Sequence, residues 1–105
     1  MSSKVERELA NWQERARIAR EYNNDALAAA CDYLVQEYQL LLKSEEEHEN
    51  EFLLKALRLR KMMEASEQHR TMCVEHGLSD SAIDATYEIQ EIERKIIALV
   101  ASYNA

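Results

Sequence analysis

Apolar residues recur along the chain at steps of three and four, the spacing that places side chains on one face of an α-helix. In residues 3–22 the series consists of Val5, Leu9, Trp12, Ala16 and Ala19. In residues 80–103 it consists of Ala82, Ala85, Ile89, Ile92, Ile96, Leu99 and Tyr103. Alternating steps of three and four are typical of a coiled-coil seam. The pattern therefore predicts an amphipathic helix near each end of the chain.

Residues 25–75 also follow a helical spacing. Their seam begins with Leu27, Cys31, Leu34, Tyr38 and Leu41. In the same register it continues through Glu45, His48, Phe52, Leu59, Met62, Ser66, His69 and Cys73. The apolar content then falls between Lys43 and Asn50, where Ser44 and Glu47 have the spacing of a helix-capping box. Two alternatives stay open: one helix about 75 Å long, or two helices with a bend near Ser44. Because no Gly or Pro forces a break there, the single helix is favoured.

Short polar segments separate the predicted helices. Asn23-Asn24 can adopt the left-handed backbone of a helix end, and Gly77 can do so before Ser79 or Asp80, which would cap the last helix. The chain has no proline and only one glycine, a composition that disfavours a β-rich fold. We predict one all-α domain over residues 1–105, built of antiparallel coiled-coil or helical-bundle hairpins. One long central helix would be flanked by two shorter helices.

A rod of this kind would be only two helices thick, because short connections make successive helices antiparallel neighbours. Several apolar residues would then lie outside the internal seams and need another surface. The predicted interaction surface consists of Leu53, Leu54, Leu57, Met63, Ile97 and Val100. Self-association would cover these side chains, so the sequence predicts a homo-oligomer, with a further protein partner also expected.

The formal net charge of -7 opposes binding to nucleic acid or to anionic lipid, both of which attract Lys and Arg. No segment has the run of apolar residues that a membrane span needs, and the N-terminal residues lack the apolar core of a signal peptide. Cys31 and Cys73 both fall on apolar faces, as reduced thiols in a cytoplasmic protein do. We therefore expect a cytoplasmic location.

His69, Cys73 and His76 share one helical face, and imidazole and thiolate are zinc ligands. No second cluster of Cys and His supplies a fourth ligand. In the alternative interpretation Cys73 packs in an apolar environment and the histidines lie at a helix C-terminus, where a cation is favoured. The sequence also has no Gly-rich phosphate loop and no long loop that could build a pocket. We expect neither an enzyme nor a bound cofactor.

The segment Trp12-Gln13-Glu14-Arg15-Ala16, the break at Asn23-Asn24 and the following Asp25-Ala26-Leu27-Ala28-Ala29-Ala30 resemble the phage shock protein A family, which includes the vesicle-inducing protein in plastids. The resemblance covers roughly residues 8–45. It implies a coiled-coil hairpin that polymerises into membrane-remodelling scaffolds. This chain departs from the family in three respects: it is about half the expected length, it lacks the N-terminal membrane-binding helix, and it has Asn where the family's turn often has Gly.

These observations favour a non-catalytic helical protein–protein interaction module, an adaptor, regulator or chaperone-like protein that acts as a homo-oligomer. One alternative is a peripheral membrane-stress scaffold or regulator similar to the phage shock protein A family. A second alternative is a metal-binding helical bundle.

Overall fold

The computed structural model describes residues 3–44 and 50–104, and these residues form four α-helices without any strand. The helices are α1 (Ser3–Glu21), α2 (Asp25–Lys43), α3 (Glu51–Glu75) and α4 (Ser79–Tyr103). The predicted all-α class is therefore confirmed. None of the described helices is both long and apolar enough to cross a membrane.

A left-handed residue closes the turn between α1 and α2. Asn23 has φ 58°, and the N–H groups of Asn23 and Asn24 donate to the carbonyl oxygens of Arg20 and Ala19 at 3.1 and 2.8 Å. These two bonds satisfy carbonyls that a helix end leaves unpaired. The Asn24 side chain then accepts a hydrogen bond from Leu27 N–H at 3.3 Å and caps α2. The predicted break at Asn23-Asn24 is confirmed.

The turn between α3 and α4 has the same design. Gly77 has φ 72°, and the N–H groups of Gly77 and Leu78 donate to the carbonyl oxygens of Val74 and Cys73 at 3.2 and 2.8 Å. The left-handed glycine is therefore confirmed. The predicted cap is wrong, because Leu78 occupies the N-cap position without a side-chain hydrogen bond and Ser79 is already helical.

The single central helix is also wrong. α2 ends at Lys43, where Ser44 Oγ donates back to the Leu41 carbonyl at 2.8 Å. α3 begins after Asn50, which is its N-cap residue. The Asn50 backbone is extended, and its side chain accepts a hydrogen bond from Leu53 N–H at 2.9 Å. Ser44 thus ends one helix and does not start the next, and Glu47 lies outside the described residues. The largest extent of the molecule is 48 Å, shorter than a continuous helix over residues 25–75 would require.

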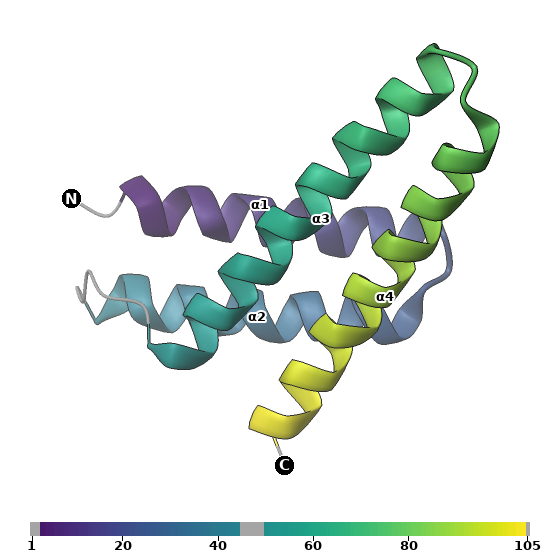
Figure 1. The fold of residues 1–105 in the computed structure, drawn as a ribbon. Helices are drawn as coiled ribbons and strands as arrows, with labels where there is room; N and C mark the ends of the chain where they lie inside the picture. The colour runs from purple at the N-terminus through teal and green to yellow at the C-terminus, as the bar shows by residue number, and fades with distance from the viewer. Residues whose placement is uncertain (1–2, 45–49, 105) are drawn as a thin grey trace.

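The four helices form two antiparallel hairpins that cross. α1 packs along α2, α3 packs along α4, and α2 contacts α4 where the hairpins meet (Figure 1). The main core draws residues from all four helices and includes Trp12, Leu34, Tyr38, Leu53 and Ile96. The predicted pairing of neighbouring helices is right, but the two halves fold across each other instead of forming a rod.

The buried face of α3 differs from the predicted seam. It consists of Phe52, Leu53, Ala56, Leu57, Arg60, Met63 and Cys73. The predicted seam correctly includes Phe52 and Cys73, which are buried. It also places Leu59 and Met62 inside, yet Leu59 is half-buried and Met62 is exposed. The register shifts because α3 starts anew at Asn50 and does not continue α2.

Most residues of the predicted interaction surface are not exposed in the single chain. Leu53, Leu57, Met63 and Val100 are buried within one chain, and Ile97 packs against the core. Leu54 alone among the six predicted residues is exposed. Four of the six residues are therefore covered within one chain, and Ile97 is half-buried.

Candidate interaction surface

Two ion pairs join α1 to α3 at the crossing. Arg60 Nε donates to Glu8 Oε1 at 2.7 Å, and Arg60 Nη2 donates to Glu8 Oε2. Arg15 Nη1 and Nη2 donate to Glu67 Oε2 and Oε1 at 2.7 and 2.5 Å. Positions 8 and 15 on α1 match positions 60 and 67 on α3, with the charges exchanged. Two pairs at the same step along both helices fix how α3 lies against α1.

The Glu8–Arg60 pair is buried, with only 4% of Glu8 and 6% of Arg60 exposed. Burial acts to lower the pKa of Arg60, but the hydrogen bond from Arg60 to Glu8 and the charges of Glu8 and Glu64 outweigh it and raise the pKa. Arg60 Nη1 also donates to Glu64 Oε1 at 2.5 Å. The guanidinium therefore stays charged in the interior, where a lone charge would be costly.

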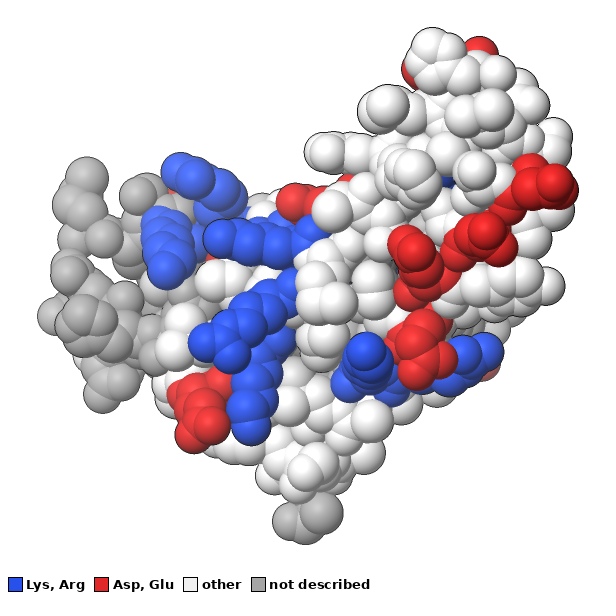
Figure 2. Space-filling model, in the orientation of Figure 1, with Lys and Arg blue, Asp and Glu red and all other residues white. Residues whose placement is uncertain are grey.

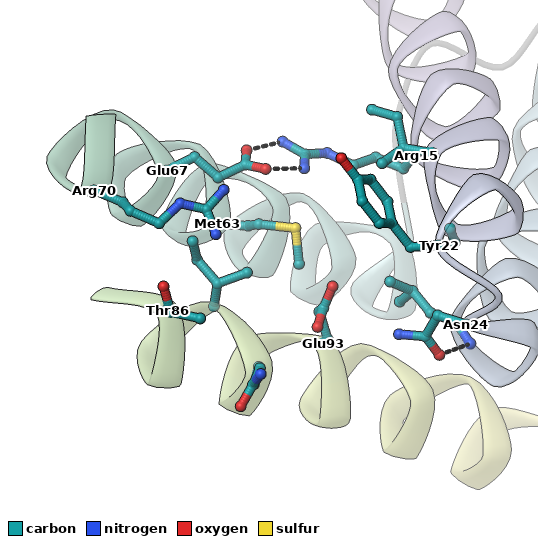
Figure 3. Close-up of a pocket in the computed structure, with 13 residues that line it drawn as sticks. Arg15, Tyr22, Asn24, Met63, Glu67, Arg70, Thr86 and Glu93 are labelled. Carbon is teal, nitrogen blue, oxygen red and sulfur yellow. Dashed lines mark hydrogen bonds and ion pairs between the residues drawn. The ribbon is translucent and has the colours of Figure 1, made fainter. Parts of the chain in front are cut away.

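A groove of about 510 Å³ opens between the hairpins beside the Arg15–Glu67 pair. Figure 3 shows Arg15 on α1, Glu67 and Arg70 on α3 and Glu93 on α4 around this space, with Tyr22 reaching toward it from the α1–α2 turn. The groove is a gap between hairpins that carries charges of both signs.

Polar and charged side chains line the groove, and the hydroxyl of Thr86 in this lining donates to the Ala82 carbonyl oxygen at 3.0 Å. Its lining contains no His, Cys or Ser. Burial, and then the negative charge of Glu67, raise the pKa of Glu93. The hydrogen bond to Glu67 raises the pKa of Arg15. These shifts follow from packing charged residues between two hairpins.

The distal end of the α3–α4 hairpin exposes large apolar side chains. We define the distal end as residues 71–87, which lie away from the crossing (Figure 1). Its exposed apolar residues are Met72, Val74, Leu78, Ile83 and Tyr87. Beneath them lie the buried residues Cys73 and Ala85, neither of which belongs to the main core. The distal end thus exposes apolar side chains where the buried residues lie outside the main core.

Charge is divided along the same hairpin. No Lys or Arg occurs between Arg70 and Arg94, whereas Asp and Glu recur through this stretch. Figure 2 shows Asp and Glu following α4 toward the distal end, and Lys and Arg over the first half of α3 and the second half of α4. The hairpin therefore has an acidic half near its turn and a basic half near the crossing.

The candidate metal ligands are only partly gathered. Cys73 Sγ lies 3.6 Å from His69 Nε2, one helical turn apart on α3. His76 is the C-cap residue of α3 and does not join them. Within residues 3–44 and 50–104 no three His, Cys, Asp or Glu side chains form a group that could hold a metal ion. The structure therefore brings His69 and Cys73 together and leaves His76 apart from them.

Sequence reasoning missed both the ion pairs and the exposed distal end. The distal end had a signal, since Val74 and Leu78 flank the Gly77 turn in a stretch without Lys or Arg. The sequence carries no signal for the ion pairs, because nothing in it distinguishes Glu8 and Arg60 from the solvated charges around them.

No protein-family model, curated protein or solved structure matches this chain. The resemblance to the phage shock protein A family stays a prediction.

Proposed function

We propose that this protein is a non-catalytic helical protein–protein interaction module, an adaptor, regulator or chaperone-like protein. The observation that carries the proposal is the distal end of the α3–α4 hairpin. Val74 and Tyr87 are each 65% exposed there, although the chain buries most of its other large apolar residues. Exposed apolar side chains gathered at one end of a small domain are typical of a contact surface.

The partner is a protein with an apolar surface bordered by basic side chains. Glu75 and Asp80 are charged residues among the apolar side chains of the distal end. Opposite charges at the rim of an interface guide binding and exclude partners with the wrong charge. The cytoplasmic location expected from the sequence is part of this proposal.

The test compares two double variants in a quantitative co-purification. Val74→Glu with Ile83→Glu places charges on the distal end, and Tyr22→Glu with Leu40→Glu is the matched control on exposed apolar residues of the other hairpin. The first variant is expected to lose the partner while its circular dichroism is unchanged, and the control is expected to keep it. Equal recovery of partners by both variants, or turnover of a substrate, would contradict the proposal.

A further inference from the structure

One outer face of the α3–α4 hairpin carries exposed residues in two continuous rows. The row on α3 is Arg58, Met62, Ala65, His69 and Met72, and the row on α4 is Asp84, Glu88, Glu91, Lys95, Ala98 and Ser102. Every residue in both rows is exposed. Steps of three and four keep each row on one side of its helix, as in a coiled-coil seam that lacks its partner.

The end of this outer face near the crossing is a shallow basic groove. It has a volume of about 540 Å³, with a floor of Leu59, Met62, Ala98 and Leu99. Lys55, Arg58 and Lys95 border it. Lys55 lies 3.5 Å from Glu51, but Arg58 and Lys95 form no ion pair with any described residue. The groove therefore combines an apolar floor with two cations, Arg58 and Lys95, that have no counter-charge among the described residues.

The other end of the outer face is acidic. Asp84, Glu88 and Glu91 occupy the first part of the α4 row, before Lys95. Glu88 Oε2 accepts a hydrogen bond from Ser66 Oγ at 3.4 Å, which places Glu88 on the side of α4 toward α3. Met72, which is exposed, ends the α3 row at the same end of the hairpin. The two ends of the outer face thus carry opposite charges.

We infer, building on the proposed function, that the outer face of the α3–α4 hairpin binds the same face of a second copy in an antiparallel, two-fold symmetric dimer. In this arrangement the acidic end of each copy covers the basic groove of the other. A two-fold axis makes both contacts at once, because each copy presents the same patch. A parallel arrangement would place like charges opposite one another.

The size of the face agrees with this assignment. A hairpin of two 25-residue helices is about 37 Å long and about 20 Å wide. Such a face offers about 700 Å² per copy, close to the area of about 800 Å² per partner that a standard interface buries. The distal apolar residues Val74, Leu78 and Ile83 lie outside the two rows. A dimer formed this way leaves them free for the partner in the proposed function.

Charge exchange tests the dimer. One double variant is Arg58→Glu with Lys95→Glu, and the other is Asp84→Lys with Glu88→Lys. Sedimentation velocity over a concentration series is expected to show a dimer for the natural sequence, weakened by salt. Each variant alone is expected to raise the dimer Kd at least about tenfold, because like charges then face one another. An equimolar mixture of the two variants is expected to recover a one-to-one dimer.

The matched control is Arg7→Glu with Lys43→Glu, which changes two exposed cations of α1 and α2 and is expected to leave the dimer intact. The dimer is overturned by a natural chain that stays monomeric at hundreds of micromolar, or by folded variants that dimerise unchanged. It is also overturned by a mixture that fails to pair, or by chains that grow beyond two copies.

The proposed function and the dimer can fail separately. If the protein is a monomer and Val74→Glu with Ile83→Glu abolishes partner binding, the proposed function stands and the dimer is overturned. If the partner is lost instead through Arg58→Glu with Lys95→Glu, the outer face belongs to a different protein and the dimer is overturned. A dimer that captures no other protein overturns the proposed function alone.

Discussion

Replacing Glu8 by Gln is expected to destabilise the protein far more than its single lost charge would on the surface. Glu8 and Arg60 are both nearly inaccessible to water, and two hydrogen bonds join them. Breaking a buried pair by removing one partner costs about 3–5 kcal/mol, because the remaining charge is left buried. Because Arg60 keeps its contact with Glu64, the expected loss of folding stability lies at the lower end of this range, at about 3 kcal/mol.

Equilibrium urea denaturation followed by far-ultraviolet circular dichroism measures this loss. With a slope of about 1.5 kcal/mol per M, the midpoint is expected to fall by about 2 M. The matched carboxylate-to-amide control is Asp32→Asn, which breaks the exposed Arg20–Asp32 pair and is expected to change stability by less than about 0.5 kcal/mol. A loss under about 1 kcal/mol for Glu8→Gln would refute the assignment of a buried charge.

Three further predictions concern single residues. Gly77→Ala is expected to cost about 1 kcal/mol through its left-handed backbone and not through a clash, because a Cβ there meets nothing within 4 Å; an unchanged melting temperature would contradict this. Glu93→Gln is expected to stabilise the protein at neutral pH, since burial and the Glu67 charge raise the pKa of Glu93 and make its ionised form unfavourable. The stability contributed by the wild-type Glu93 carboxyl group is present at low pH and is lost as the pH rises through the raised pKa. Urea titrations at several pH values should therefore show the stability advantage of Glu93→Gln growing over that pH range and vanishing in acid. Burial raises the pKa of Cys31 to about 12, so alkylation followed by peptide mass spectrometry is expected to modify Cys31 only after unfolding, and rapid modification of the folded protein would contradict its burial.

Local patterns predicted the helices and turns that local chemistry determines. The seam of α1 is buried as its spacing indicates, apart from half-buried Leu9. Asn23 and Gly77 both adopt the left-handed backbone that ends a helix. In each case the residues that decide the structure are close in the sequence, so their spacing carries the information.

The prediction failed where a non-local contact decides the structure. α3 has apolar residues on most of its sides, so hydrophobicity alone gives it no single buried face. Continuing the register of α2 into α3 predicts that Leu59 and Met62 lie inside and that Leu53 and Met63 lie outside. In the structure Leu53 and Met63 are buried, whereas Leu59 is half-buried and Met62 is exposed. Contacts with residues far away in the sequence show which side of α3 lies inside: Arg60 pairs with Glu8 of α1, and the Phe52 ring stacks on Tyr103 of α4.

The ion pairs supply the orientation that the apolar pattern of α3 lacks. Glu8 and Arg15 reach positions 60 and 67 only when Arg58, Met62 and Met72 face outward, so the outer face depends on the seam between α1 and α3. Glu8→Met with Arg60→Met is therefore expected to keep stability within about 1 kcal/mol of the natural chain, because well-packed apolar residues replace a buried pair at little cost. The same variant is expected to let α3 rotate about its axis, because apolar side chains on several faces can then compete for the core. Amide hydrogen exchange should become faster in α3 than in α2, although the unfolding midpoint is nearly unchanged. Uniform protection of α3 in this variant would show that packing alone sets its orientation.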